Sequence, residues 1–268
     1  QGEIGAPSKT RKPAALADAF TLHDPVRPTM NGIYHDPEGY GVVSDGRILL
    51  ASKRLYDEGK KGKIVATHKI KGEAEKGDEI SGKYVKWRNV IPGKEGARKV
   101  KADLGRLADF LTGAEAMMKA EKSEKGAVLV RMPDGSLHWL DVGKMLDFVE
   151  AARFLGVEEM EYTEADRAIV GRSEDGMVLM MPMYIADEYD GKRFYYDLSD
   201  GHRQTPTNTT IDEAIGFSIK VNHNSPYLIK KADGSFVDPE TGERLGFDHR
   251  FMNTGEGAQA HGWGSYFS

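Results

Sequence analysis

The sequence contains two helical patterns, each followed by several short strand patterns. Apolar residues recur at three- and four-residue spacing over 102–119 and again over 142–155, which predicts two helices. Strand patterns at 127–132 and 137–140 follow the first helix, with Pro133-Asp134-Gly135-Ser136 as the turn between them. Strand patterns at 159–163, 168–173 and 177–184 follow the second. This order predicts an α+β fold in which a helix-and-sheet unit occurs twice.

The chain before these helices is predicted to be strand-rich. Residues 33–34 and 40–50 read as strands around a turn at 36–39, and Asp45-Gly46 supplies a tight turn within the second run. A further short strand is expected at 63–71. Residues 1–16 are expected to form a flexible tail, 17–187 one domain and 188–268 a C-terminal extension. A capping box at 210–213 predicts a helix to about residue 220.

Composition excludes several classes of protein. The 268 residues contain no cysteine and no apolar run near 18 residues, so disulfides, thiolate metal sites and a membrane span are not expected. A cytoplasmic location is the default. His223, His249 and His261 lack the helical spacing of known metal motifs, and no metal or other cofactor is predicted. Because no P-loop, nucleophile elbow or paired-carboxylate motif occurs, the chain is expected not to be an enzyme.

A basic stripe is the main asymmetry of charge. Residues 53–101 carry 15 Lys and Arg against 7 acids, although the whole chain has a net charge of -5. Cations with interleaved aromatic residues can follow a phosphate backbone, whereas lysines in glycine-rich loops are commonly just solvated. The residues predicted to contact nucleic acid, and DNA in particular, are Lys60, Lys61, Lys63, Lys83, Lys86, Arg88, Arg98 and Lys99.

Four phrases occur in a fixed order along the chain. They are residues 27–34 (RPTMNGIY), 44–47 (SDGR), 84–92 (YVKWRNVIP) and 178–183 (VLMMPM). Together they resemble the bacterial DNA sliding clamp, in which an LNG strand precedes an ATDGHRL turn, an FPDYRRVLP segment joins two domains, and the last strand closes on VVMPM. The resemblance covers about residues 17–187. It implies a sliding-clamp-like helix-and-antiparallel-sheet module with a smaller, irregular C-terminal extension.

The resemblance also implies a binding site. In sliding clamps the turn and the terminal strand line a shallow apolar pocket that takes short linear motifs of polymerases and repair proteins. The residues that match here are Ser44, Gly46, Arg47, Ile48, Leu49, Met181, Pro182 and Met183. Methionine suits such a pocket because its flexible, polarizable side chain adapts to varied partners. The alternative is that residues 180–183 form an edge strand of the core.

This chain departs from the clamp pattern in two respects. Arg47-Ile48 stands where the family has His-Arg, and the chain continues for 85 residues beyond Met183. Neither predicted helix is clearly basic, although a helix that lines a ring around DNA should be positive. A clamp-like module is therefore favoured over a complete processivity ring.

The C-terminal segment resembles a second family. Residues 247–267 (FDHRFMNTGEGAQAHGWGSYF) are similar to the GTGEGAQAFGWGLYF stretch of ADP-ribosyltransferase-like domains in large polyvalent proteins of phages and conjugative elements. His223 of an HNSP phrase, and Tyr266, match the His and Tyr that hold NAD in that family. The glutamate that would stabilise positive charge at the ribose has no counterpart before Ser268. The segment is therefore expected to be part of a longer protein. NAD is expected to bind only to that longer protein.

The sequence is consistent with three functions. The first is a non-enzymatic clamp-like module of a phage or mobile-element protein that binds a partner peptide and, through the stripe, DNA. The second is an incomplete part of an NAD-dependent ADP-ribosyltransferase. The third is a structural spacer domain.

Overall fold

The computed structural model describes residues 11–163, 168–185, 189–200, 204, 206, 229–230 and 236–237. The chain divides into two compact units, residues 1–211 and 212–268. In the second unit the described residues are the antiparallel pair β13 (Ile229–Lys230) and β14 (Phe236–Val237). The helix predicted to end near residue 220 lies outside the described residues.

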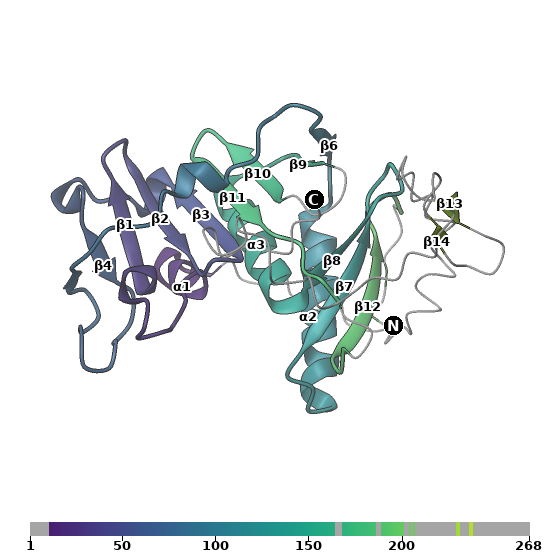
Figure 1. The fold of residues 1–268 in the computed structure, drawn as a ribbon, viewed down its shortest axis with the longest axis horizontal. Helices are drawn as coiled ribbons and strands as arrows, with labels where there is room; N and C mark the ends of the chain where they lie inside the picture. Colours follow the sequence, from purple (N-terminus) through teal and green to yellow (C-terminus); the bar gives the residue numbers. More distant parts are fainter. Residues whose placement is uncertain are drawn as a thin grey trace, which may run out of the picture. The chain divides into compact units, whose positions relative to one another are not determined.

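A nine-stranded antiparallel sheet forms one layer of the first unit (Figure 1). Its strand order is β5-β4-β1-β2-β3-β11-β10-β9-β6. The strands are β1 (Gly32–Asp36), β2 (Tyr40–Ser44), β3 (Ile48–Ser52), β4 (Ile64–Ala66), β5 (Glu79–Ile80), β6 (Arg98–Val100), β9 (Met160–Tyr162), β10 (Ile169–Ser173) and β11 (Gly176–Met180). Pairing of β3 with β11, with Ile48 opposite Met180, joins the N-terminal strands to the C-terminal ones.

A second, three-stranded sheet has the order β12-β7-β8. Its strands are β7 (Gly126–Arg131), β8 (Leu137–Asp141) and β12 (Lys192–Asp197). β12 lies beyond the domain boundary predicted after residue 187, yet it pairs in parallel with the whole of β7. The sequence pattern missed this strand because its partner lies 66 positions earlier, as in the pairing of Lys192 with Gly126.

The two predicted helices are confirmed. α2 spans Leu104–Ala120, close to the expected 102–119, and α3 spans Val142–Leu155 as expected. The Asp141 carboxylate accepts a hydrogen bond from the Lys144 amide at 2.9 Å, which caps α3 at its N-terminus. Gly156 ends the helix in the left-handed region, with φ of 70°. The succession of helix, two strands, helix and three strands is therefore present, and the α+β class is confirmed.

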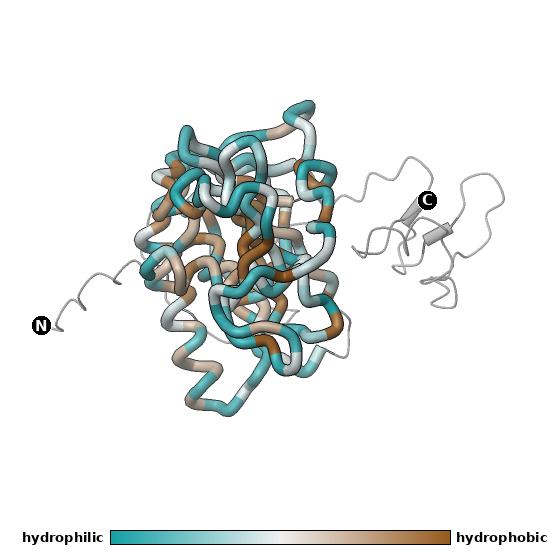
Figure 2. The backbone as a smooth tube through the Cα atoms, turned by 90° about the vertical axis from the view of Figure 1, so that its left-hand side faces the viewer, coloured by the Kyte–Doolittle hydropathy of each residue, from teal (hydrophilic) through white to brown (hydrophobic). Residues whose placement is uncertain are grey.

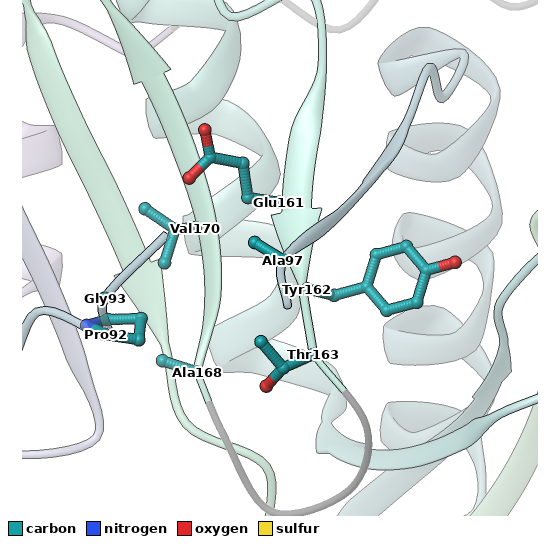
Figure 3. Close-up of a pocket in the computed structure, with 8 residues that line it drawn as sticks. All are labelled: Pro92, Gly93, Ala97, Glu161, Tyr162, Thr163, Ala168 and Val170. Carbon is teal, nitrogen blue, oxygen red and sulfur yellow. The ribbon is translucent and has the colours of Figure 1, made fainter. Parts of the chain in front are cut away.

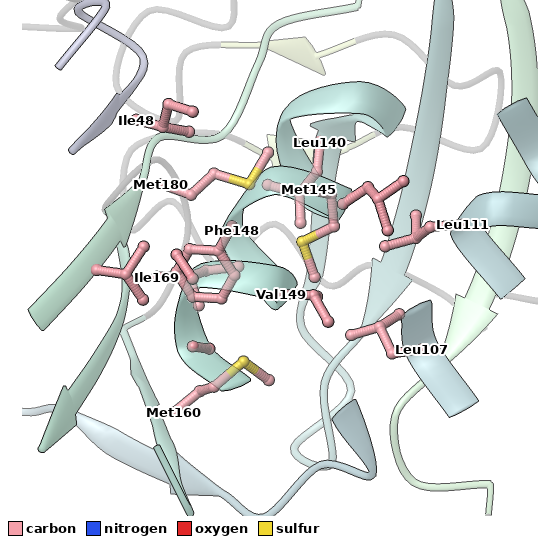
Figure 4. Close-up of a cluster of buried hydrophobic side chains, with 14 of the residues drawn as sticks. Ile48, Leu107, Leu111, Leu140, Met145, Phe148, Val149, Met160, Ile169 and Met180 are labelled. Atoms are coloured by element: carbon pink, nitrogen blue, oxygen red, sulfur yellow. The ribbon is translucent and has the colours of Figure 1, made fainter. Parts of the chain in front are cut away.

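The core lies between the large sheet and the helices. Figure 4 shows Ile48, Ile169 and Met180 extending from the sheet toward α3, while Leu107 and Leu111 of α2 approach α3 from the opposite side. Since α3 is covered on two sides, most of its residues are buried. Figure 2 shows hydrophobic stretches in the middle of the first unit and hydrophilic ones in its loops. Among the described residues, no helix has the length and apolar character needed to cross a membrane.

A helix begins within the segment 1–16, which was predicted to be a flexible tail. Helix α1 spans Pro13–Ala19, and Leu16 is fully buried against the core. Arg11 forms ion pairs with two carboxylates of α3, at 2.6 Å to Asp147 and 2.7 Å to Glu150. The sequence pattern missed this helix because one short apolar face of seven residues is a weak periodic signal, whereas its stability comes from tertiary packing.

The segment between β3 and α2 is mostly loops and short turns. The strand predicted at 63–71 is confirmed only as β4, and β5 and β6 were not predicted. The remaining elements here are 3-10 helices, as is the one that leads into β1. They are η1 (Pro28–Asn31), η2 (Lys53–Leu55), η3 (Glu58–Lys60) and η4 (Trp87–Val90).

Burial of Asp147 predicts a specific pH dependence of stability. Loss of solvation raises the pKa of Asp147 to about 6, with Arg11 opposing the shift. Because the folded pKa lies above the ordinary value of 3.8, the folded state gains stability as pH falls from above 6 toward 4. Asp147→Asn is expected to raise the free energy of unfolding at pH 7 by about 1–3 kcal/mol. The gain should vanish near pH 4.

Urea unfolding of wild type and of Asp147→Asn between pH 4 and pH 7 measures the effect. Asp109→Asn, at an exposed position of α2, is the matched control for the loss of one negative charge. A stability difference between wild type and Asp147→Asn that stays constant from pH 4 to pH 7 would contradict the prediction.

Candidate peptide-binding surface

The turn between β2 and β3 is held by its own side chains. One oxygen of Asp45 accepts hydrogen bonds from the amides of Arg47 at 2.8 Å and Ile48 at 2.9 Å. The Ser44 hydroxyl donates to the Ile48 carbonyl at 2.8 Å. Gly46 has φ of 92°, a conformation that glycine adopts without strain. These bonds fix the backbone so that the Arg47 side chain is exposed to solvent.

An ion pair fastens this turn to α3. The other Asp45 oxygen lies 2.9 Å from the Lys144 ammonium group, and only 7% of the Asp45 side chain is exposed. Lys144 is itself largely covered. Charged pairs that are shielded from water are screened less than surface pairs. The turn is therefore anchored to the helix beneath it as well as to its own strands.

The segment after β11 runs directly beside this turn. The Met181 amide donates a hydrogen bond to the Arg47 carbonyl at 2.9 Å, and the Met183 amide donates to the Trp139 carbonyl of β8 at 2.8 Å. Met181, Pro182 and Met183 are half-buried. The next residue, Tyr184, has 72% of its surface exposed. The structure thus brings the predicted turn and the predicted methionine segment together.

The predicted pocket residues differ in their access to solvent. Ser44, Ile48 and Leu49 are buried, at 2%, 0% and 1% exposure, because Ser44 ends β2, Ile48 and Leu49 begin β3, and both are interior strands of the large sheet. They can support a surface from beneath but cannot touch a ligand directly. The accessible members are Gly46, Arg47, Met181, Pro182 and Met183. Met180 belongs to the core, and its strand is interior rather than the edge strand considered as an alternative.

Residues 84–92 cover the face of the sheet next to Met181. Trp87 is buried in a cluster with Leu49 and Leu179, and Ile91 and Met181 pack against the same cluster. The segment that resembles the clamp's domain connection is therefore packed onto the sheet in this structure. It forms one wall of the region that surrounds Met181.

Asp36 fastens this covering segment to β1. Its carboxylate accepts a hydrogen bond from the Trp87 indole at 3.0 Å and two from the Arg88 guanidinium at 2.8 and 3.0 Å. The Arg88 hydrogen bonds lower the pKa of Asp36 to about 2, and burial opposes them. Arg88 also lies over the Trp87 ring, 4.2 Å from its centre. The sequence pattern gives no sign of these bonds, because the partners of Asp36 are 51 and 52 positions away.

A small hollow opens at the other end of this covered face (Figure 3). It lies between Pro92 and β10 and has a volume of about 10 Å³. That volume holds about one water molecule. The Glu161 carboxylate at its rim is paired with Arg172 at 2.8 Å. The hollow is too small for a peptide side chain. The lining residues are Pro92, Gly93, Ala97, Glu161, Tyr162, Thr163, Ala168 and Val170.

The basic stripe is largely paired with acids. Six of its eight predicted cations form ion pairs: Lys60 with Asp57, Lys61 with Glu58, Lys63 with Glu79, Arg88 with Asp36 and Glu38, Arg98 with Asp134, and Lys99 with Glu159. The exceptions within the described part of the chain are Lys83 and Lys86, which are exposed. Local carboxylates therefore offset much of the positive charge that the sequence suggested.

The residues matched to the NAD-binding family, His223 and Tyr266, lie outside the described residues. The same is true of the whole phrase over 247–267.

No protein-family model and no curated protein sequence matches this chain. Among solved structures, it is similar to bacterial DNA polymerase III β subunits. The subunit from Borrelia burgdorferi, in complex with a natural product, has a TM-score of 0.45 and 15% identity over 65% of this chain. The match covers 62% of the Borrelia chain, which is less than two thirds of its length.

Two further solved structures are similar to this chain. The C. crescentus β sliding clamp has a TM-score of 0.45 and 18% identity, covering 69% of this chain and 68% of that one. The Helicobacter pylori β clamp bound to a DNA ligase peptide has a TM-score of 0.43 and 12% identity, covering 68% of this chain and 65% of that one.

Proposed function

We propose that this chain is a non-enzymatic, clamp-like module that binds a short linear peptide on the surface formed by Arg47 and residues 181–183. The observation that carries the proposal is the hydrogen bond between the Met181 amide and the Arg47 carbonyl. It brings together two segments of the clamp-like sequence that lie more than 130 positions apart. The resulting surface combines half-buried methionines, an exposed tyrosine and a cation.

The chemistry of this surface favours an apolar peptide with an acidic flank. Methionine side chains can repack around different apolar anchors, so one surface can accept several sequences. Tyr184 offers a large aromatic contact, and aromatic residues are enriched where peptides and proteins bind. The exposed Arg47 guanidinium can pair with a carboxylate of the ligand. The surface is held by the Asp45–Lys144 pair and by backbone bonds, so little ordering should be required on binding.

Met183→Ala is expected to weaken peptide binding by about tenfold or more, because truncating a hot-spot residue near the centre of an interface costs about 2 kcal/mol or more. A peptide is first selected from a random linear library on the full chain. Its fluorescein-labelled form is then titrated by fluorescence polarization against wild type and variant.

Arg47→Glu is expected to weaken binding of the same peptide when the peptide contains an acidic residue. The loss of affinity should be smaller at high salt, because salt screens the charges.

Met117→Ala is the matched control, since Met117 is a half-buried methionine on α2 that lies outside this surface. Equal loss of affinity in Met117→Ala and Met183→Ala would contradict the proposed location. Failure to select any peptide that competes for this surface would contradict peptide binding itself.

DNA contact and an origin in a phage or mobile element stay predictions from the sequence. Lys83 and Lys86 are the stripe residues to change first, because local acids offset the other six. Charge reversal at both should abolish any salt-sensitive retention on short duplex DNA.

A further inference from the structure

A cluster of three metal-ligating side chains lies apart from the candidate peptide surface. Asp18 is in the last turn of α1, His23 is in the loop that follows, and His68 comes two residues after β4. One oxygen of Asp18 lies 3.0 Å from Nδ1 of His68 and 3.7 Å from Nε2 of His23. The donor atoms of all three residues lie within 4.8 Å of one another. We propose that Asp18, His23 and His68 bind a divalent transition metal ion, with Zn²⁺ as the ion.

The donor set matches the coordination chemistry of zinc. Zinc binds imidazole nitrogens at about 2.0–2.1 Å and carboxylate oxygens at about 2.0–2.2 Å, usually with tetrahedral geometry. In such a site neighbouring donors lie roughly 3.4 Å apart. The two separations, 3.0 and 3.7 Å, lie on either side of that value. Rotation of the histidine side chains would bring all three donors onto one ion, with a fourth position left for water or another ligand.

The two histidine rings lie side by side in a stack. Their planes are nearly parallel, at 11°, with centres 3.9 Å apart. Because imidazole nitrogens donate in the plane of the ring, at least one ring must turn about its side-chain bonds for both to bind one ion. Both rings present a nitrogen to the same Asp18 oxygen.

Surrounding groups hold the ligands in place. The Thr67 hydroxyl donates to the Asp18 carboxylate at 2.9 Å, the kind of supporting hydrogen bond that orients metal ligands. Asn31, which is fully buried, connects the two loops. The Asn31 side chain accepts a hydrogen bond from the Asp24 amide at 2.9 Å and donates one to the Asp24 carbonyl at 2.7 Å. The backbone carbonyl of Asn31 accepts a hydrogen bond from the Thr67 amide at 3.2 Å. The loops that carry His23 and His68 are thus braced against each other.

The cluster is open to a cation from solvent. His23 is exposed, whereas Asp18 and His68 are half-buried. In the described part of the chain, the ionisable partners of Asp18 are these two histidines, and no lysine or arginine is paired with it. The negative charge of Asp18 is therefore available to the ion. A bound ion would link α1 to the end of β4 through Asp18 and His68, which are 50 positions apart in the sequence. It would stabilise the fold because it binds the native state and not the unfolded chain.

Zn²⁺ binding to the chelator-treated full chain tests the proposal by isothermal titration calorimetry. The expected result is one ion per chain and a Zn²⁺-dependent rise in Tm. Asp18→Ala, His23→Ala and His68→Ala should each weaken binding by about 100-fold or more, and Thr67→Val by about tenfold, since losing a supporting group costs 10–100-fold. Co²⁺ should give visible absorption bands that His68→Ala abolishes.

The triple variant His223→Ala, His249→Ala and His261→Ala is the control for binding elsewhere in the chain, and it should bind Zn²⁺ as wild type does. His23→Ala addresses the risk of misfolding, because 51% of the His23 side chain is exposed, and circular dichroism should show an unchanged fold. Absence of stoichiometric Zn²⁺ binding by wild type would overturn the proposal. The proposal would also be overturned if the triple variant lost Zn²⁺ binding while His23→Ala and His68→Ala retained it.

Discussion

Phe148→Ala is expected to lower the free energy of unfolding by about 3–5 kcal/mol, the range for truncating a large buried aromatic residue. Phe148 is fully buried on α3. In Figure 4 it lies on the side of α3 that faces Ile169 and Met180 of the sheet. Removal of its ring would leave a cavity where the sheet and α3 meet, in addition to the loss of buried apolar surface. Urea denaturation followed by circular dichroism measures the change.

A control is available on the same helix. Phe154 lies six positions later but is only half-buried, with the Arg54 guanidinium 5.3 Å from its ring centre. Phe154→Ala should cost no more than about 1–2 kcal/mol, because a partly exposed ring loses less buried surface. Phe148→Leu should cost less than about 1.5 kcal/mol, since it keeps most of the apolar volume. A similar loss in Phe148→Ala and Phe154→Ala would contradict the assignment of Phe148 to the core.

Asp36→Ala is expected to lower the free energy of unfolding by about 2–4 kcal/mol. The substitution removes the acceptor of the buried Trp87 indole, and an unsatisfied buried donor costs about 1–3 kcal/mol. It also removes a buried partner of Arg88, although 40% of that side chain is exposed and water can solvate it in part. Since Trp87 and Arg88 hold residues 84–92 on the sheet, the same variant should expose Trp87, shifting its fluorescence to longer wavelength.

The pH dependence of this effect follows from the lowered pKa of Asp36. Its folded-state pKa is about 2, below the ordinary value of 3.8. The carboxylate therefore contributes its full stabilisation above about pH 4 and loses it as pH falls through 2. The stability difference between wild type and Asp36→Ala should be constant from pH 5 to pH 7 and should shrink below pH 4.

Glu38→Ala separates burial from charge. Glu38 pairs with the same Arg88 at 2.8 Å, but 69% of its side chain is exposed. Exposed ion pairs contribute about 0–1 kcal/mol, so this variant should have little effect. If Glu38→Ala destabilises the protein as much as Asp36→Ala, the buried position of Asp36 is not what makes it important.

Local patterns in the sequence determined the elements that depend on near neighbours. The helix over 142–155 is predicted to the residue because the apolar spacing that defines it lies within one short segment. The turns at Asp45-Gly46 and Asp134-Gly135 follow from glycine's freedom at positive φ, which Gly46 and Gly135 both use. These features involve side chains and backbone groups only a few positions apart.

The tertiary structure alone decided which of these elements meet. Pairing of β3 with β11 brings Arg47 to Met181, a contact that the clamp resemblance implied but no spacing in the chain could predict. Three other features had no local signal in the sequence. They are the attachment of residues 84–92 through Asp36, the parallel pairing of β12 with β7, and the cluster of Asp18, His23 and His68. Contacts across 50 or more residues depend on the packing of whole layers, because each one is favourable only when the core beneath it has formed.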